Sequence, residues 1–576
     1  MKKYCLRLAF LAIVAVGPRA FAQATTELVS ADSAGTIGDK WSAVDSPPHP
    51  IYCGMSASGD GQYIAFASYA SNLVVGDTNG IWDVFVRDRS TGVTERVSVD
   101  SSGVEGTYYS WQPSISSDGR FVAFSSGASN LVAGDTNNAF DVFVHDRSTG
   151  GTDRISLDSS GNEANGSSQW PSISSDGRFV AFSSDASNLV AGDSNGKRDV
   201  FVRDLQTGTT ERVSVDSSTA QGDGDSGYGG FAISGNGLVV AFASDASNLV
   251  AGDSNGKRDV FVHDRVSGAT ERMSVDSAGT QSDASSGGAS LSADGSIVAF
   301  DSDATNLVGN DTNGKRDVFV RDRPSGAVER VSVDSFGAQG ISSPYPWDES
   351  IGSYAPTIST DGNSVAFMSD AGNLVLNDNW VPDVFAHDRD TGYTEKVSVD
   401  SAGVSGTQSS RWGSISGDGN VVAFASLAPN LVAGDTNGAF DVFVRNRWVI
   451  DATSTAYGQG LAGTNGEPSL TPRARPVLGT TLDVDISNSS GAISFGMVFV
   501  GFQRAQWHTS WGGDLLVVPT LALLVGLPTG GTTLTGPIPN DESLAGLFVD
   551  LQVLEHDPGA LRGVSFSSGL ELTLGR

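Results

Sequence analysis

Residues 117–147 contain the stretch that decides the fold: Ser117-Asp118-Gly119-Arg120-Phe121-Val122-Ala123-Phe124, followed by Asp141-Val142-Phe143-Val144-His145-Asp146-Arg147. The first string, S-x-D-G-x-x-V-A-F or a near variant, recurs and ends at Phe66, Phe124, Phe182, Phe242, Phe300, Phe367 and Phe424. The second, D-V-F-V-[RH]-[DN]-R or a near variant, begins at Asp83, Asp141, Asp199, Asp259, Asp317, Asp383 and Asp441. Such self-similarity is the sequence signature of a repeat architecture.

Each repeat is predicted to hold four short strands. In the second repeat they are Pro113–Ser116, Phe121–Ser126, Asp141–Asp146 and Thr152–Asp158. Turn signals such as Asp118-Gly119 separate them. The middle strands are apolar on both faces and the fourth alternates, which is typical of a sheet packed between neighbouring sheets with its last strand at the outside. A four-stranded sheet repeated around an axis is the blade of a β-propeller.

The two ends of the repeat region predict how the propeller closes. A third string, T-E-R-V-S-V-D-S or a near variant, follows each of the first six copies, but the seventh copy ends at Arg447 without it. The missing strand occurs at the other end of the chain, as Thr26–Ser33. We therefore expect an all-β, seven-bladed β-propeller over residues 23–450. Thr26–Ser33 would close the last blade, begun by Ser414–Arg447, and leave no open sheet edge.

The Ser117–Phe124 hairpin resembles the TolB-type, WD-repeat-like propellers of bacterial envelope proteins. The resemblance covers residues 26–447 and implies the propeller fold alone. These repeats are longer than the usual ones because each carries an insertion, S-N-L-V-x-G-D-[TS]-N-G. The chain also lacks a counterpart of the N-terminal domain of TolB proper. A role in the Tol envelope system is therefore not implied.

The segment before the repeats has the features of a signal peptide. A basic start precedes the apolar run Leu8–Val16, and Ala20-Phe21-Ala22 provides an A-x-A cleavage site. We expect cleavage of residues 1–22 after Ala22 and a secreted or periplasmic protein. The apolar run is too short to span a bilayer, so no transmembrane segment is expected.

The segment after the repeats is predicted to be a second domain. Residues 451–576 alternate short apolar runs with Gly and Pro. This pattern predicts a C-terminal β-sandwich accessory domain.

The charge of the chain limits its partners. Acidic residues number 66 against 35 basic ones, so the formal net charge is −31. Such a field repels nucleic acid, which is therefore not an expected partner. It is compatible with bound divalent cations. We expect the chain to be a monomer.

The inserted loop, G-D-[TS]-N-G-x-x-D, is the candidate metal site. Its carboxylate, amide and second carboxylate offer the hard oxygen ligands that Ca²⁺ prefers, and the loop resembles a shortened calcium loop of integrin-type propellers. The alternative is a structural turn in which the Asp accepts backbone N–H bonds, since a third acidic position and a closing Glu are missing. The candidate ligands are Asp77, Asn79, Asp83, Asp193, Asn195, Asp199, Asp253, Asn255, Asp259, Asp311, Asn313, Asp317, Asp435, Asn437 and Asp441.

Aromatic residues form a second candidate site. They precede the predicted first strands, and antiparallel alternation places them at the same rim as the inserted loops. Flat rings among Asp, Asn and Ser suit the binding of sugars by stacking and hydrogen bonding. The alternative is that the rings cap the core between blades. The candidates are Tyr52, Trp111, Trp170, Tyr228, Tyr354 and Trp412.

These features favour a non-enzymatic function. We expect an exported propeller scaffold that binds a protein or a polysaccharide through its loop-bearing face. The alternative is a hydrolase or lyase that acts on glycans or peptides at the propeller channel. A catalytic site needs one repeat to break the symmetry with matched acid and base groups. The sequence predicts no catalytic residue, but its most divergent segment, Gly340–Tyr354, is the place for such a break.

Overall fold

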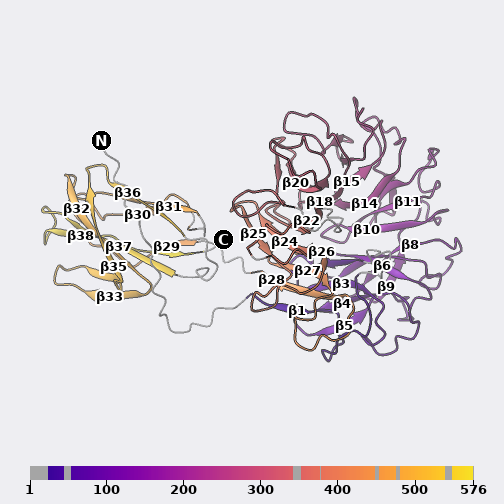
Figure 1. Cartoon of the computed structure of the whole chain (residues 1–576), viewed down its shortest axis with the longest axis horizontal. Helices are drawn as coiled ribbons and strands as arrows, with labels where there is room; N and C mark the ends of the chain where they lie inside the picture. The colour runs from indigo at the N-terminus through magenta and orange to yellow at the C-terminus, as the bar shows by residue number, and fades with distance from the viewer. Residues whose placement is uncertain are drawn as a thin grey trace. The chain divides into compact units, whose positions relative to one another are not determined.

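The computed structural model describes residues 24–43, 54–341, 352–376, 378–447, 453–474, 476, 480–538 and 548–574. Over these residues the chain is all-β: the regular elements are strands, and there is no helix. Accordingly, none of the described segments is a helix long and apolar enough to cross a membrane. The predicted signal peptide lies outside the described residues. The chain divides into two compact units, Gln23–Arg447 and one that contains Trp448–Arg576 (Figure 1).

The first unit contains seven four-stranded antiparallel sheets within its described residues. Six are formed in chain order, by β2–β5, β6–β9, β10–β13, β14–β17, β18–β21 and β22–β25, and the seventh has the order β26-β27-β28-β1. The strands are β1 (Thr26–Leu28), β2 (Met55–Ala57), β3 (Tyr63–Ser68), β4 (Asp83–Asp88), β5 (Val93–Arg96), β6 (Ser110–Ile115), β7 (Phe121–Ser126), β8 (Asp141–Asp146), β9 (Gly151–Arg154), β10 (Ser168–Ile173), β11 (Phe179–Ser184), β12 (Asp199–Asp204), β13 (Thr209–Arg212), β14 (Ser226–Ile233), β15 (Val239–Ser244), β16 (Asp259–Asp264), β17 (Thr270–Arg272), β18 (Ser286–Leu291), β19 (Ile297–Ser302), β20 (Asp317–Asp322), β21 (Val328–Arg330), β22 (Ser353–Ile358), β23 (Ser364–Ser369), β24 (Asp383–Asp388), β25 (Tyr393–Lys396), β26 (Ser410–Ile415), β27 (Val421–Ser426) and β28 (Asp441–Asn446).

The core of this unit lies between neighbouring sheets. In the third sheet, Phe182 of β11 is paired with Phe201 of β12, and their ring centroids are 5.8 Å apart. These rings pack in one buried cluster with Val142 and Val144 of the second sheet. The middle strands are thus apolar on both faces because each face meets another sheet. This explains the recurrence of V-A-F and D-V-F-V in every repeat.

Strand β1 joins the two ends of the unit. It pairs antiparallel with β28, with Thr26 opposite Arg445 and Leu28 opposite Phe443. Figure 1 shows the indigo β1 beside the orange β28. The seventh sheet in turn packs on the first, because Val442 and Val444 share a buried cluster with Phe66. The sheets therefore return to their starting point, which is the arrangement of a β-propeller.

A ring of backbone hydrogen bonds links the S-x-D-G turns of successive sheets. Gly59 donates its N–H to the Ser117 carbonyl at 2.9 Å, and Ser117 donates to Ser175 at 3.0 Å. The series continues around the unit until Asp418 donates to the carbonyl of Gly59 at 2.9 Å. The remaining links are Ser175 to Gly235, Asn236 to Ala293, Ala293 to Thr360 and Thr360 to Gly417. Each turn thus satisfies its neighbour's backbone groups.

Three strands have bounds that differ from the prediction, and one of them is the closing strand β1, which is Thr26–Leu28 and not Thr26–Ser33. The first strand of the second sheet, β6, is Ser110–Ile115 and begins before the predicted Pro113. The fourth strand, β9, is Gly151–Arg154 and ends before the predicted Asp158. The ladder stops because the Ser156 hydroxyl, not its backbone, accepts the N–H of Val142 at 3.2 Å.

The second unit consists of short antiparallel sheets. One has the order β29-β39-β37-β32-β35 with β38 on β37, another is β30-β31-β36, and β33 pairs with β34. Val484 and Ile486 of the three-stranded sheet share a buried cluster with Val498 and Val553 of the larger one. The strands are β29 (Thr453–Tyr457), β30 (Leu470–Pro472), β31 (Thr481–Ile486), β32 (Ser494–Gly501), β33 (Arg504–His508), β34 (Asp514–Val517), β35 (Leu521–Leu527), β36 (Thr532–Pro537), β37 (Phe548–His556), β38 (Val564–Phe566) and β39 (Gly569–Thr573).

Candidate functional site: the carboxylate cages of the loop-bearing rim

The long connections of the repeats gather at one end of the sheets. In the second sheet, residues 127–140 join β7 to β8, and residues 155–167 lead from β9 to the next sheet. At the opposite end, only residues 116–120 and 147–150 join consecutive strands. We call the end with the long connections the loop-bearing rim. Trp111 pairs with Ser125 near this end of the sheet, so the structure places this aromatic at the same rim as the inserted loop.

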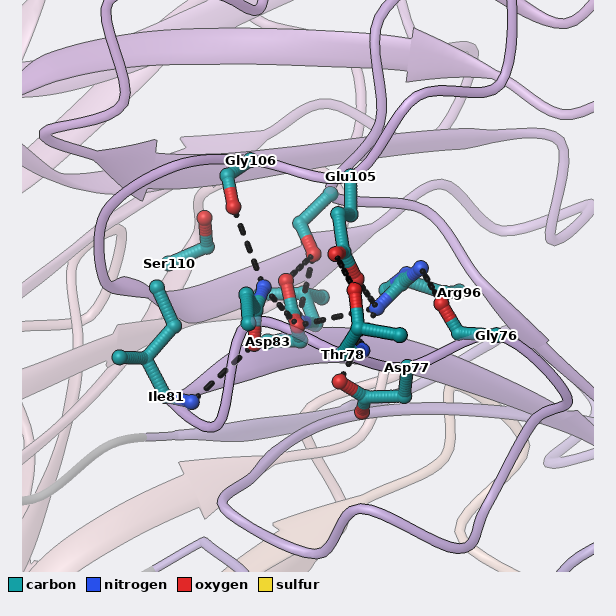
Figure 2. Close-up of polar contacts among 12 residues, drawn as sticks. Gly76, Asp77, Thr78, Ile81, Asp83, Arg96, Glu105, Gly106 and Ser110 are labelled. Atoms are coloured by element: carbon teal, nitrogen blue, oxygen red, sulfur yellow. Dashed lines mark hydrogen bonds and ion pairs between the residues drawn. The ribbon is translucent and has the colours of Figure 1, made fainter.

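In the first sheet, the inserted loop brings acidic side chains around a guanidinium group (Figure 2). Arg96 Nη1 lies 3.3 Å from Asp77 Oδ1, 3.3 Å from Asp83 Oδ2 and 2.7 Å from Glu105 Oε2. Arg96 also donates from Nη2 to the carbonyl of Gly76 at 3.3 Å. We call this arrangement of loop Asp, strand Asp and central cation a carboxylate cage.

Local turn chemistry builds the cage. Asn79 Oδ1 accepts the N–H of Ile81 at 3.1 Å, while Asn79 Nδ2 donates to Asp83 Oδ2 at 2.7 Å. Gly80 has φ 66°, a left-handed conformation that suits glycine. The Ser98 hydroxyl donates to Asp83 Oδ1 at 2.5 Å. Each of Asp83's two oxygens thus has a fixed partner.

Burial dominates the electrostatics of the cage. Desolvation raises the pKa of Asp77 to about 6, the Asp83 charge adds to this effect, and Arg96 opposes it. Burial also raises the pKa of Asp83, and the hydrogen bond from Ser98 and the charge of Arg96 oppose this shift. Asp77, Asp83 and Glu105 lie close enough together to share a metal ion. Arg96, however, already contacts all three carboxylates.

The cage recurs with its cation in five further sheets. Two carboxylates flank each basic group: Arg154 contacts Asp135 and Asp141, Arg212 contacts Asp193 and Asp199, Arg272 contacts Asp253 and Asp259, Arg330 contacts Asp311 and Asp317, and Lys396 contacts Asp378 and Asp383. The amides keep the same role, since Asn195, Asn255 and Asn313 donate to Asp199, Asp259 and Asp317. Calcium binding by these loops stays a prediction.

The seventh sheet departs from this pattern. Asn437 Nδ2 donates to Asp441 Oδ2 at 2.7 Å, as in the other cages. Burial raises the pKa of Asp441 to about 7 and also raises that of Asp435. In the other six sheets the fourth strand supplies the basic residue. In the seventh sheet the fourth strand is β1, and Leu28 occupies the position of the basic residue.

The predicted aromatics do not share one repeat position. Tyr52 lies outside the described residues, and Tyr228 lies in β14, where its side chain is not described. Trp111 stacks between Tyr109 and Phe140, with centroids 6.0 and 5.1 Å away. Tyr354 and Trp412 meet edge to face at 6.2 Å. All four remaining rings, Trp111, Trp170, Tyr354 and Trp412, are partly buried within first strands and do not precede them.

Sequence reasoning missed a bulge in the first strands. The pairing with the second strand shifts register there in the second to seventh sheets. Trp170 and Trp412 occupy the bulge with φ 59° and 54°, a left-handed conformation that bulky residues rarely adopt. Such strain is typical of functional sites. The equivalent residues are Gly54, Gln112, Gly230, Gly288 and Ala355.

Asp301 is a second residue that the prediction missed. The other sheets have Ala, Ser or Met at its place in the second strand, for example Ser125. Its Oδ2 accepts the bulge N–H of Ala355 at 3.1 Å, and its Oδ1 lies 3.4 Å from Arg316 Nη1. Burial raises its pKa, and Arg316 opposes the shift. The sequence contained a signal for this residue, because every other repeat has a neutral residue at the equivalent position.

The buried histidines give a testable pH dependence. His387 Nδ1 lies 2.8 Å from the Thr394 hydroxyl, and burial lowers the pKa of His387 to about 4. Between pH 6.5 and 4 the unfolded chain binds a proton that the folded chain does not, so stability is lost as the pH falls. We expect His387 to account for a loss of about 3 kcal/mol over this range.

Denaturant unfolding of the wild type and His387→Arg from pH 4 to 7 measures this effect. Arginine stands at the equivalent place in other sheets, as at Arg203, where it donates to the carbonyl of Asp158 at 2.8 Å. The difference in stability between the two proteins should change with pH. A constant difference would contradict the assignment.

Comparison with known proteins gives similarity in fold. No protein-family model matches the chain, and no curated protein sequence does. Among solved structures, a TolB-like protein from Agrobacterium tumefaciens is similar at 15% identity, over 62% of this chain and 94% of that chain, with a TM-score of 0.33. The WD40 repeats of RRP9 match at 10% identity over 73% and 99%, with a TM-score of 0.36. A GH74 xyloglucanase from Xanthomonas campestris matches at 9% identity over 93% and 68%, also with a TM-score of 0.36.

The TM-scores are low, so the architecture rests on the sheets of this chain and on the closed ring of hydrogen bonds that links them. The sequence resemblance to TolB-type and WD-repeat-like propellers agrees with the kinds of structure matched. The first unit is a β-propeller, built of four-stranded sheets that close into a ring.

Proposed function

We propose that this protein is an exported, non-enzymatic scaffold whose seven-bladed propeller binds a protein or a polysaccharide at the loop-bearing rim. Its C-terminal unit is, in this proposal, a β-sandwich accessory domain. The observation that carries the proposal is the unequal length of the connections at the two ends of the sheets. Long surface loops held by a rigid scaffold are where binding residues concentrate.

The repeated polar residues support binding over catalysis. Arg96 and its counterparts are engaged with carboxylates in the cages. The strand histidines face threonine hydroxyls, as His145 does with Thr152 at 2.8 Å and His263 with Thr270 at 2.9 Å. These groups hold sheets and loops together in the same way in repeat after repeat. A catalytic centre would need acid and base groups that depart from this symmetry.

Side chains of the rim offer contact surface. Val75 and Leu376 lie in the connections after β3 and β23 and are almost fully exposed. Trp170 and Trp412 are half-buried and sit on strained backbone in the first strands. Strain of this kind persists where the surroundings hold it in place, and it is common at ligand sites. Together these residues suit a partner with both apolar and polar groups.

The double variant Trp170→Gly/Trp412→Gly tests the proposal. Glycine occupies the same bulge at Gly54 and Gly288, so the left-handed backbone is preserved. The secreted chain is to be screened against a glycan array and against exported proteins. We expect the double variant to bind the partner found at least about tenfold more weakly, a loss of about 1.4 kcal/mol.

The matched control lies at the opposite end of the sheets. Val266 is exposed in the turn between β16 and β17, and Val266→Asp should leave binding unchanged. Equal affinity of the wild type and the double tryptophan variant would refute a role of the bulge residues. Loss of binding in Val266→Asp alone would move the binding surface to the other end.

Asp301 favours the alternative, a hydrolase or lyase that acts on glycans or peptides. It is a buried carboxyl with a raised pKa in one sheet only, beside Arg316. Asp301→Ser restores the residue found at Ser125. Turnover of a glycan or peptide by the wild type that this exchange abolishes would replace the scaffold proposal. The predicted segment Gly340–Tyr354 borders this sheet, but residues 342–351 lie outside the described residues.

A further inference from the structure

Among the described residues, the seventh sheet keeps the two Asp residues of the carboxylate cage but has no basic residue at the position of the cation. Leu28 pairs with Phe443 in β28 just as Arg96 pairs with Phe85 in β4. Leu28 therefore stands where the cation of the first cage stands. The counterpart of Glu105 is not acidic either. The β-bridge between Ala31 and Ile37 matches the one between Val99 and Glu105, so Ile37 stands in place of Glu105.

The carboxylates of this cage are nevertheless kept and buried. Asp441 Oδ1 accepts the Ser30 hydroxyl at 2.6 Å, as Asp83 accepts Ser98 in the first sheet. Asp441 is fully buried, and Asp435 has a relative exposure of 6%, so more than nine-tenths of it is buried. The loop and strand positions of the cage are thus preserved although its cation is not.

Among the described residues, Asp435 is the carboxylate of the cage that is held by a backbone group and by no cation. Its carboxylate accepts the backbone N–H of Asn437. Within the part of the chain that the structure describes, it forms no ion pair and no side-chain hydrogen bond. The matching carboxylates elsewhere face a cation, such as Asp193, whose Oδ1 is 3.1 Å from Arg212 Nη1. Leaving a buried carboxylate without a counter-charge is costly.

The donors of the first cage indicate what would fill the seventh. There the cation meets the carboxylates of Asp77, Asp83 and Glu105 and the carbonyl oxygen of Gly76, and all of these but Glu105 have counterparts in the seventh cage. The corresponding groups in the seventh cage are Asp435, Asp441 and the carbonyl of Gly434. These are hard oxygen donors with two negative charges, which match a divalent ion. Ca²⁺ accepts flexible sets of carboxylate, carbonyl and water oxygens and tolerates an incomplete protein shell.

We propose that the seventh cage binds one Ca²⁺ ion through Asp435 and Asp441, whereas the basic side chains of the other six cages take the place of such an ion. The inserted loops are then one family of cation sites. Six of them hold the charged side chain of an Arg or Lys, and one holds an exchangeable ion. The ion stabilises the sheet where β1 closes the ring.

Calorimetric titration of the chelator-treated secreted chain with CaCl₂ tests the proposal. We expect one site per chain in the wild type and a Ca²⁺-dependent rise of the thermal midpoint, since an ion that binds the native state stabilises it. Leu28→Arg supplies the cation of the other cages and should lower Ca²⁺ affinity at least about hundredfold, or about 2.7 kcal/mol. Leu28→Met, the uncharged control, should bind Ca²⁺ as the wild type does.

Two further variants make the outcome decisive. Arg96→Leu empties the first cage and should raise the stoichiometry from one site to two. Asp435→Asn, which keeps the shape of the side chain, should remove the wild-type site even if Leu28→Arg does not fold. Absence of binding by the wild type, or equal Ca²⁺ affinity of folded Leu28→Arg and Leu28→Met, would overturn the proposal. Wild-type Ca²⁺ affinity of Asp435→Asn would also overturn the proposal.

Discussion

Deletion of residues 24–33 is expected to abolish the stable fold of the propeller. The deleted strand contributes Val29, which is fully buried against Val442 and Val444. It also reaches both neighbouring sheets: the Thr26 hydroxyl donates to the Val399 carbonyl at 2.5 Å, and Glu27 pairs with Arg89 at 3.2 Å. We expect a loss of more than about 5 kcal/mol, the scale of the whole stability of a domain.

Thermal unfolding, size-exclusion chromatography and limited proteolysis measure this loss. The exposed edge of β28 should pair with other chains, so aggregation should accompany it. A synthetic peptide of residues 24–43 should restore the midpoint, and a scrambled peptide should not. Glu27→Ala, which removes a partly exposed ion pair with Arg89 and a hydrogen bond from Asn446 but leaves the strand in place, should cost less than about 1 kcal/mol. A truncated protein with the wild-type midpoint would show that closure by β1 does not stabilise the propeller.

Lys396→Met is expected to destabilise the protein by about 3–5 kcal/mol at pH 7. Lys396 Nζ lies 2.7 Å from Asp378 Oδ1 and 2.6 Å from Asp383 Oδ2, and all three side chains are almost completely buried. Methionine keeps the length of the side chain but leaves two buried carboxylates without a counter-charge. Lys396→Arg, which reproduces the cation of the other cages, should cost less than about 1.5 kcal/mol.

The loss in Lys396→Met should shrink as the pH falls. Burial already raises the pKa of Asp383 to about 6, and the Lys396 charge opposes the shift. Removing that charge raises the pKa further, so the folded variant holds a proton that the unfolded chain, with the ordinary pKa of 3.8, has lost. Stability therefore falls as the pH rises from 3.8 through the folded pKa. Denaturant unfolding at pH 5 and 7.5 with a chelator present measures this dependence, and equal losses at both values would refute it.

The repeated strings predict the four strands of each sheet because each string is a complete local unit. Phe121–Ser126 and Asp141–Asp146 were predicted at the bounds that the structure has, since both are apolar on both faces. The bulge at Trp170 was not predictable in this way. Its backbone N–H donates to the Ser125 hydroxyl of the preceding sheet at 3.1 Å. Local strand propensity does not take account of such a contact between sheets.

The sequence predicted the acidic residues of the candidate cage but not its basic residue. The loop acids Asp77 and Asp83 belong to one motif, whereas Arg96 belongs to another string and meets them only when the third and fourth strands pair. A signal was nevertheless present. Six copies of the fourth-strand string have Arg or Lys at this position, and only the first copy along the chain, which closes the seventh sheet, has Leu28.

The position of β1 also governs the time at which the molecule can finish folding. Thr26 begins the first strand of the ring to be synthesised, whereas Arg445, which donates a hydrogen bond to it across 419 residues, is among the last residues of the ring to be made. Until then the first strand has no partner and the growing stack of sheets has two open edges. Contacts so distant in sequence form slowly. Two nascent chains held close together could exchange their first strands during this interval, so crowding during synthesis favours swapped dimers whose rings are each completed by the other copy.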